Sequence, residues 1–282
     1  MKQERHNYEY QVDIDEDGAP ARVVRLVGKD KRVMEIGAGP GSITRLLTSL
    51  SNCRVTALEI DSEAIKKLAP FCERVYQVDL NDKAWSVTIE GDEQFEVIVA
   101  ADVLEHVYEP LTVLKAMRGF LNEDGYMVIS IPHVGHSAVH ACLLDEDFEY
   151  SDFGLLDRTH IRFFGIKNIQ KLFEDAAMKI VHAEFVVRNP EHTEFANQWS
   201  KLSPEIRNAL ASNPFGSVYQ VVVKAVRADA AEEAISLMSL SVKSSAPTLR
   251  DSVRGVLRSC LSTKAYSTLR QVAAKLGLNF KG

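Results

Sequence analysis

Three glycines at alternate positions, Gly37, Gly39 and Gly41, form the centre of the stretch RVMEIGAGPGSIT, residues 32–44. Glycine has no Cβ, so the backbone there can bend sharply and come close to a ligand. The apolar residues before the turn predict a strand that contains Glu35, and the residues after it predict a helix whose first N–H groups can bind a ligand. Strand, glycine turn and helix together indicate the nucleotide-binding end of a doubly wound α/β sheet.

Two further acidic residues follow predicted strands. Glu59 lies at the end of the apolar stretch 54–60, and a carboxylate there can accept hydrogen bonds from both hydroxyls of a ribose. Asp79 and Leu80 follow a short third strand, 74–78, where an acid suits the exocyclic amine of an adenine and an apolar residue suits its ring face. These positions predict a site for an adenosine-containing ligand.

The helices and strands that position these residues follow from the hydrophobic periodicity. A short helix at 19–28 leads into the first strand, and the nearly continuous apolar run at 95–101 predicts a strand buried on both faces. Asp124 and Gly125 predict a turn before the next strand. The remaining predicted helices cover 42–50, 62–68, 111–121, 166–176, 204–211 and 229–240, and the remaining predicted strands cover 126–131, 179–187 and 217–226.

The composition of the 282 residues, 46% hydrophobic and 26% charged, is that of an ordinary globular chain with one large domain and an appendage. No apolar run approaches the roughly 20 residues that span a bilayer. The first 18 residues contain no apolar segment typical of a secretory signal. Four cysteines are scattered without metal-ligand spacing, which indicates reduced thiols. We therefore expect a cytoplasmic protein.

The net charge of −6 is unevenly distributed. Residues 241–282 carry eight Lys and Arg against one acid, a net charge of +7, whereas residues 1–240 hold 25 basic and 38 acidic residues, a net charge of −13. The acidic body argues against a nucleic-acid partner, because phosphate contacts need a basic face. The basic tail predicts two helices, 248–261 and 265–278, which could pack on the body, contact a partner protein or a second copy of the chain, or lie on an anionic membrane surface.

Four motifs stand in a fixed order along the first half of the chain. They are E-x-G-x-G-x-G at 35–41, LEID at 58–61, VDL at 78–80 and FEVIVAADVLEHV at 95–107. In this order, each at the end of a predicted strand, they resemble the motif series of class I S-adenosylmethionine (SAM)-dependent methyltransferases. The resemblance implies a Rossmann-like α/β sheet of seven strands, the last one antiparallel.

In that family the glycine loop holds the methionine end of SAM, the carboxylate after the second strand binds the ribose, and the Asp after the third strand meets the adenine amine. The resemblance therefore implies SAM as the cofactor and S-adenosylhomocysteine (SAH) as its product. The residues that it assigns to the cofactor are Glu35, Gly37, Gly39, Gly41, Glu59, Ile60, Asp79, Leu80 and Asp102. We expect an N-terminal lid and helix at 1–30, the methyltransferase domain at 31–227 and a basic helical extension at 228–282.

A later stretch resembles a narrower group, the methyltransferases of bacterial surface-polysaccharide (O-antigen type) biosynthesis. Their pattern PNVxH followed by GLLDxTHxRFF corresponds here to PHVGH at 132–136 and GLLDRTHIRFF at 154–164. His133 stands where that group usually has Asn, which is a departure from the pattern. The resemblance implies a sugar hydroxyl as the methyl acceptor.

A hydroxyl acceptor benefits from a general base, and histidine is the side chain best suited to that role near neutral pH. The candidate catalytic residues are His106, His133, His136, Asp157 and His160. His106 could instead cap a helix, and Asp157 and His160 could only hold their loop in place. We expect no metal, because the His, Asp and Glu residues show no tight ligand spacing.

Three functions remain open at this point. The leading hypothesis is a SAM-dependent O-methyltransferase that acts on a sugar of a surface polysaccharide or glycoside. The second keeps the chemistry but uses a quinone-like or natural-product hydroxyl or amine, because the LEHV segment is shared with such enzymes. The third is a SAM-binding partner of a glycosyltransferase that no longer catalyses. A dehydrogenase is disfavoured, because no second mononucleotide-binding half is visible.

Overall fold

The computed structural model describes residues 9, 10, 12–89 and 94–242. The chain divides after Val242 into two units, and all of these residues belong to the first one. Residues 228–242, which we had assigned to the C-terminal extension, therefore belong to the same unit as the sheet. The predicted helices 248–261 and 265–278 lie outside the described residues, so their proposed partner and membrane contacts remain predictions.

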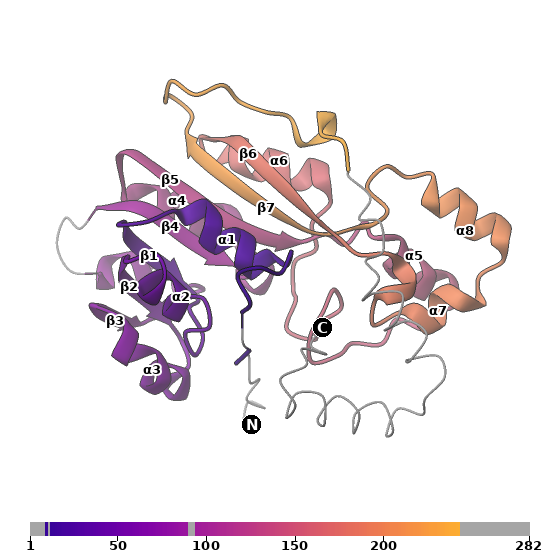
Figure 1. The fold of residues 1–282 in the computed structure, drawn as a ribbon, viewed down its shortest axis with the longest axis horizontal. Coiled ribbons are helices and arrows are strands. Elements are labelled where there is room, and N and C mark those ends of the chain that lie inside the picture. The colour runs from indigo at the N-terminus through magenta and orange to yellow at the C-terminus, as the bar shows by residue number, and fades with distance from the viewer. Residues whose placement is uncertain (1–8, 11, 90–93, 243–282) are drawn as a thin grey trace. The chain divides into compact units, whose positions relative to one another are not determined.

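The predicted seven-stranded sheet is present, in the order β3-β2-β1-β4-β5-β7-β6 (Figure 1). Every neighbouring pair from β3 to β5 is parallel, and β7 is antiparallel to both β5 and β6. The fold class expected from the sequence is confirmed. The strands are β1 (Arg32–Ile36), β2 (Arg54–Glu59), β3 (Arg74–Gln77), β4 (Phe95–Ala101), β5 (Leu121–Pro132), β6 (Met178–Val187) and β7 (Val218–Arg227).

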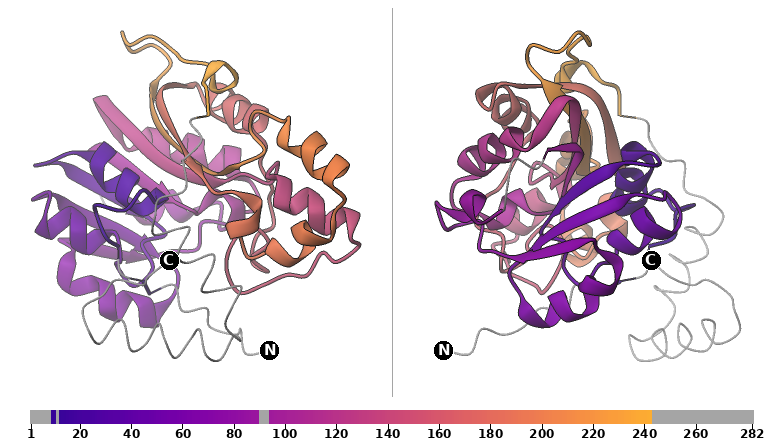
Figure 2. Two further views of the ribbon diagram at one scale, coloured as in Figure 1. Left: turned by 45° about the vertical axis from the view of Figure 1, so that its right-hand side comes forward. Right: turned by 90° about the vertical axis from the view of Figure 1, so that its left-hand side faces the viewer.

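Helices cover both faces of the sheet, because neighbouring residues of a strand point to opposite faces. In β1, Val33 belongs to the apolar cluster that contains residues of α1, α2 and α3, whereas Met34 belongs to the cluster that contains residues of α4 and α6. Helices α5, α7 and α8 lie beyond the ends of β6 and β7 (Figures 1 and 2). The helices are α1 (Ala19–Val27), α2 (Thr44–Ser49), α3 (Ser62–Leu68), α4 (Pro110–Gly119), α5 (Ser137–Leu144), α6 (Ile166–Asp175), α7 (Ala196–Lys201) and α8 (Pro204–Ala211).

Two predicted elements are wrong. The Asp124–Gly125 pair forms no turn but lies inside β5, where the register with β4 shifts between Phe95 and Val97 and so accommodates the extra residues. The helix predicted at 229–240 is absent apart from a short 3₁₀ turn, Leu237–Ser239. Tertiary contacts explain the second difference: the Ile235 N–H donates to the Ile180 carbonyl of β6 at 2.8 Å, and Leu237 is buried in the core.

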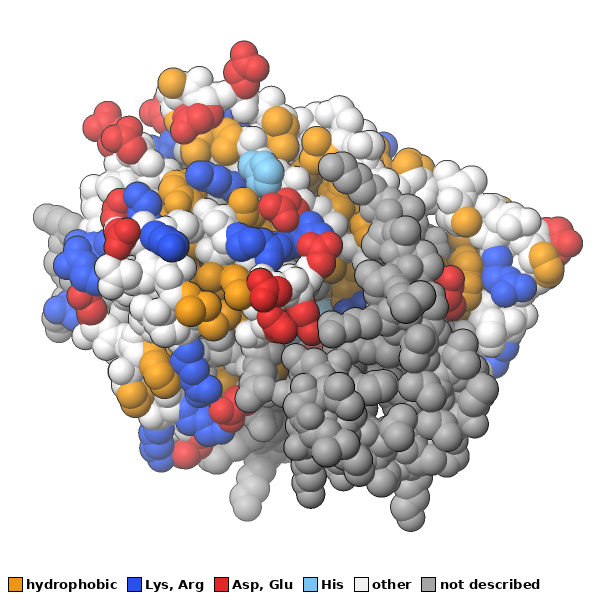
Figure 3. Space-filling model, in the orientation of Figure 1, with side chains coloured by type: hydrophobic (Ala, Val, Ile, Leu, Met, Phe, Trp, Pro, Cys, Tyr) orange, Lys and Arg blue, Asp and Glu red, His pale blue; other side chains and the backbone are white. Residues whose placement is uncertain are grey.

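Within the part of the chain that the structure describes, no helix has both the length and the apolarity needed to cross a bilayer. Acidic and basic side chains are interspersed on the described part of the face drawn in Figure 3.

Candidate active site

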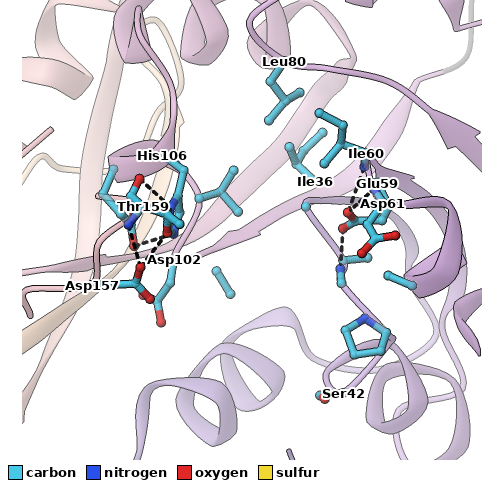
Figure 4. A pocket seen from close by; sticks show the side chains of 18 of the residues that line it. Ile36, Ser42, Glu59, Ile60, Asp61, Leu80, Asp102, His106, Asp157 and Thr159 are labelled. Carbon is cyan, nitrogen blue, oxygen red and sulfur yellow. Dashed lines mark hydrogen bonds and ion pairs between the residues drawn. The ribbon is translucent and has the colours of Figure 1, made fainter. Parts of the chain in front are cut away.

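An open cavity of about 2090 Å³ lies at the carboxyl ends of the parallel strands, where the turns after β1, β2 and β4 meet. This is the edge at which open α/β sheets bind their ligands. All but one of the predicted cofactor residues line the cavity (Figure 4). The exception is Gly41, which packs against α3.

The glycine turn has the left-handed backbone that its sequence predicts. The φ angles of Gly37, Gly39 and Gly41 are +64°, +55° and +87°. A Cβ on Gly37 would lie 2.8 Å from a methyl group of Val103, so that glycine allows the turn to approach the segment after β4. A Cβ on Gly39 would meet nothing within 4 Å, because this residue faces the cavity.

Glu59 links the end of β2 to the glycine turn. One carboxylate oxygen accepts the Gly39 N–H at 2.7 Å, and the other accepts the N–H groups of Ile60 and Asp61 at 2.8 Å each. A carboxylate has about four lone-pair sites, so three backbone donors leave capacity for a hydroxyl donor from the cavity. Glu59 can therefore accept a hydrogen bond from one ribose hydroxyl.

Glu35 lies deeper, beneath the turn. It is almost fully buried and accepts the hydroxyl hydrogen of Thr44, the first residue of α2, at 2.6 Å. Burial raises the pKa of the Glu35 carboxyl to about 7, against the opposing effect of the Thr44 hydrogen bond. Its main contact is thus with the helix that follows the turn, and it borders the cavity floor.

The adenine side of the cavity is bordered by Ile60, Asp79 and Leu80. Ile60 and Asp79 are exposed, and Leu80 is partly buried against the core. One oxygen of Asp79 accepts the Asn81 N–H at 2.9 Å, which fixes the direction of the carboxylate. An acid between two apolar side chains fits a flat base that carries an amine.

Asp102 follows β4 with a left-handed φ of +54°. Its two oxygens accept hydrogen bonds from the Ser130 hydroxyl and the Gln220 amide, both at 2.7 Å. Burial raises the pKa of this carboxyl, while the two hydrogen bonds and the nearby His106 oppose the rise. Asp102 is consequently held rigidly between the cofactor side of the cavity and β7.

The other side of the cavity contains a cluster of Glu105, His106 and His160. Both oxygens of Glu105 are buried and have no hydrogen-bond partner in the described part of the chain. One of them lies 4.0 Å from Nε2 of His106 and 3.8 Å from Nε2 of His160. The two imidazoles meet edge to face, with ring centroids 4.8 Å apart.

The hydrogen bonds of the two histidines indicate their tautomers. The Nδ1 atoms lie near carbonyl oxygens, that of Thr159 for His106 and that of Leu155 for His160, so each Nδ1 carries a hydrogen and each Nε2 a lone pair. Burial lowers the pKa of both imidazoles and raises that of the Glu105 carboxyl well above its usual range. Burial thus favours the neutral form of both imidazoles and the protonated form of the Glu105 carboxyl.

Asp157 supports this cluster. One of its oxygens accepts the N–H and the hydroxyl hydrogen of Thr159, at 2.8 and 2.6 Å, and the Thr159 hydroxyl lies 3.0 Å from Nδ1 of His106 (Figure 4). The carboxylate is buried. This geometry matches the second interpretation of Asp157, in which it holds its loop in place.

The same cluster has the composition of a metal site, since one ligand atom from each residue lies within 4.8 Å of the others. The candidate ligands are two adjacent residues and a third that lies 54 positions further along the chain, so the sequence shows no short ligand spacing. We expected no metal from the sequence; the cluster makes metal dependence a point to be tested by experiment.

His133 and His136, two of the predicted catalytic residues, do not line the cavity. His136 is fully buried; its Nδ1 accepts the Ala138 N–H and caps α5, and its Nε2 donates to the Arg188 carbonyl at 2.7 Å. His133 is also buried, and its Nδ1 donates to the Val218 carbonyl at 3.0 Å. Their place in the interior contradicts a direct contact with an acceptor, and their hydrogen bonds are to the backbone of the protein itself.

The sequence interpretation missed several residues that line the cavity. The sequence indicates Glu105 as a candidate, because it lies among the apolar residues of VLEHV and a buried acid is usually paired. The sequence indicates the other missed residues more weakly. Arg188 follows β6, and Tyr219 and Gln220 lie at the start of β7. Because β7 is antiparallel to β5, its first residues lie at the edge where the parallel strands end.

Residues 8–183 match the family described as methyltransferase domain. The chain belongs to this family. Together with the glycine turn and the carboxylates of Glu59 and Asp79, this membership makes the unit a class I SAM-dependent methyltransferase domain with SAM as its cofactor.

Named relatives are distant. A ubiquinone biosynthesis O-methyltransferase of Glaesserella parasuis is 27% identical over 106 residues, 36% of this chain and 44% of that protein. One of Parvibaculum lavamentivorans is 24% identical over 186 residues, 65% of this chain and 70% of that protein. The chain thus spans less than half the length of the former. A crystal structure of a SAM-dependent methyltransferase from Archaeoglobus fulgidus has a TM-score of 0.50 at 18% identity, over 73% of this chain and 91% of that one, and supports the fold.

Proposed function

We propose that this protein transfers the methyl group of SAM to a hydroxyl oxygen of a small organic acceptor. The observation that carries the proposal is a single cavity with two chemically different sides. One side has the glycine turn, Glu59 and Asp79, and fits an adenosine. The other has His106 and His160, whose Nδ1 atoms lie at backbone carbonyls and whose Nε2 atoms lie within 4.0 Å of a Glu105 oxygen.

Bound SAM supplies an electrophilic methyl group on a sulfonium. The chain's own residues must align the acceptor and remove its proton as the oxygen attacks. We assign proton removal to Nε2 of His160, whose Nδ1–H is fixed on the Leu155 carbonyl, with His106 as its neighbour. A base of this kind contributes about 10²- to 10⁴-fold in rate, and alignment contributes more.

Two acceptor classes have separate support. The relatives named as ubiquinone biosynthesis O-methyltransferases favour a phenolic, quinone-type hydroxyl. The resemblance of GLLDRTHIRFF to the surface-polysaccharide group favours a sugar hydroxyl, and this segment supplies Asp157, Thr159 and His160 to the cavity. Of the two, we favour the phenolic acceptor, because its ionisation demands less of a histidine base.

The test has two stages. Calorimetry with the full chain should detect SAH binding, and labelled SAM should then yield SAH and a methylated product with members of a panel of catechols, phenols and nucleotide sugars. His160→Asn should retain SAH binding and lose most turnover. Parallel assays with EDTA, with and without added Mg²⁺ or Zn²⁺, show whether Glu105, His106 and His160 need a metal. Protein that binds SAH but transfers no methyl group to any acceptor would support a non-catalytic SAM-binding role instead.

A further inference from the structure

The cavity wall opposite the glycine turn contains a second built arrangement, formed by Arg188, Tyr219 and Glu194. The guanidinium carbon of Arg188 lies 4.2 Å from the centroid of the Tyr219 ring. The Tyr219 hydroxyl donates to the Glu194 carboxylate, whose oxygens lie 2.8 and 3.0 Å away. Arg188 and Tyr219 both line the cavity.

Hydrogen bonds fix the backbone of Arg188 and the side chains of Glu194 and Tyr219. The backbone N–H of Arg188 donates to the Ser217 carbonyl at 2.9 Å, and the backbone carbonyl of Arg188 accepts from Nε2 of His136 at 2.7 Å. Glu194 also accepts the Leu155 N–H at 2.9 Å, and its approach uses the space where Gly154 has no Cβ. Burial and the Glu194 charge raise the pKa of Tyr219, which therefore keeps its hydrogen.

Among the residues that the structure describes, the guanidinium has no carboxylate partner. No described Asp or Glu lies within ion-pair distance of Arg188, although Arg22, Arg45 and Arg158 all have one. The nearby Glu194 is turned to Tyr219 and Leu155 instead. Arg188 is exposed and its guanidinium lies over the Tyr219 ring, with a fork of N–H donors that suits a planar or tetrahedral oxyanion.

The position of Arg188 separates it from the cofactor. It follows β6, which is four strand spacings from β1, or about 19 Å along the sheet. The predicted adenosine extends from β1 toward β2 and β3, in the opposite direction. Gln220, the neighbour of Tyr219 in β7, donates a hydrogen bond to Asp102 at 2.7 Å, and Gln220, Asp102 and Arg188 all line the cavity.

We propose that Arg188 binds an anionic group of the methyl acceptor, a carboxylate or a phosphate, so that the acceptor is an acidic molecule. The inference rests on the proposed function, because it assigns the acceptor side of the same cavity. Tyr219 holds the guanidinium in its binding orientation, and this pre-organisation reduces the entropy lost on binding.

The experiment uses the full chain saturated with SAH and two matched pairs of probes. One pair is 3,4-dihydroxybenzoate and catechol, and the other is glucose 1-phosphate and methyl glucoside. Calorimetry or ligand-observed NMR should show at least one acidic probe binding about tenfold or more tightly than its neutral partner, as expected for a charge-assisted hydrogen bond. The pair that shows the preference identifies the carboxylate or the phosphate.

Three variants complete the test. R188Q should remove the preference for the acid, R188K should keep part of it, and the matched control R227Q, at the other end of β7, should keep all of it. Equal binding of acidic and neutral probes, including no binding of either, overturns the proposal, as does a preference that survives in R188Q. Weaker SAH binding in R188Q also overturns it, by placing the guanidinium at the cofactor. Failure of the proposed function would appear separately, as wild-type protein that does not bind SAH or that binds it but transfers no methyl group to any acceptor.

Discussion

The carboxylate of Glu59 accepts the backbone N–H of Gly39 at 2.7 Å, so the end of β2 holds the glycine turn that follows β1. The two residues are 20 positions apart in the chain and are brought together by the parallel pairing of β1 with β2. One side chain therefore has two tasks, because it shapes the turn and presents its remaining lone pair to the cavity. Its substitution tests the cofactor half of the site.

Glu59→Gln should weaken SAH binding about 10- to 100-fold, because hydrogen bonds to a charged group contribute roughly 1.5–3 kcal/mol. The loss is expected even though glutamine keeps the size of the side chain, since its amide nitrogen cannot accept a hydrogen bond. Calorimetric titration with SAH measures it. The exposed Glu73→Gln is the control and should bind SAH like the wild type. Unchanged affinity in Glu59→Gln would contradict the assignment of the ribose.

Gly37→Ala should destabilise the protein by about 1–3 kcal/mol, because the residue has a φ of +64° and its new Cβ would press on Val103. Gly119→Ala, at the exposed end of α4 with no atom within 4 Å of the added Cβ, should instead stabilise it by about 0.4–1 kcal/mol. Urea unfolding followed by circular dichroism compares the two. Equal effects would mean that the turn tolerates a side chain and does not depend on glycine.

The buried Glu35 makes stability depend on pH. Its pKa is about 7 in the folded protein and near 4.5 in an unfolded chain, so the folded state binds more protons between these values. The contribution of Glu35 to the free energy of unfolding is therefore full below pH 4.5 and is lost as the pH rises through 7. The free energy of unfolding of Glu35→Gln, measured relative to the wild type, should therefore rise by an amount on the order of 3 kcal/mol between pH 4.5 and pH 8.

Urea unfolding at several pH values measures this difference, and the exposed Glu149→Gln serves as the control with no such trend. A constant gap between Glu35→Gln and the wild type across the range would show that Glu35 ionises normally.

His136→Ala and His160→Asn should fail in different ways. Loss of His136 removes the cap of α5 and leaves the Arg188 carbonyl without its partner, which costs about 2–4 kcal/mol of stability. His160→Asn should retain most of the stability and lose about 10²-fold or more in methyl transfer. Thermal unfolding and labelled SAM measure the two quantities. A fully active His160→Asn would remove this residue from the mechanism.

The pKa of His136 gives that residue an independent check. Burial lowers it to about 4, so NMR titration of the imidazole should show a neutral ring down to about pH 4. Its protonation there would abolish the hydrogen bond from Ala138. The stability that His136 contributes is present above its ordinary pKa of 6.5 and declines as the pH falls toward 4.

Much of the cofactor half of the site could be predicted from the sequence because it is locally encoded. Gly37, Gly39, Glu59 and Asp79 each lie at the end of an apolar strand, and parallel strands bring such ends to one edge of a sheet. The strand–turn–helix pattern around the glycines fixes the backbone within a few residues. The fold class follows from the same alternation of strands and helices.

The acceptor half was decided only by tertiary structure. His136 and His160 both match the narrower group's pattern in the sequence, and only the fold separates them. The ring nitrogens of His136 bond to Ala138 and Arg188 in the interior, while His160 meets Glu105 from 55 positions away. Arg188 reaches the cavity because β7 runs antiparallel and stacks Tyr219 beneath it. Burial and hydrogen-bond partners determine what a histidine or an arginine can do, and they depend on which distant segments pack together.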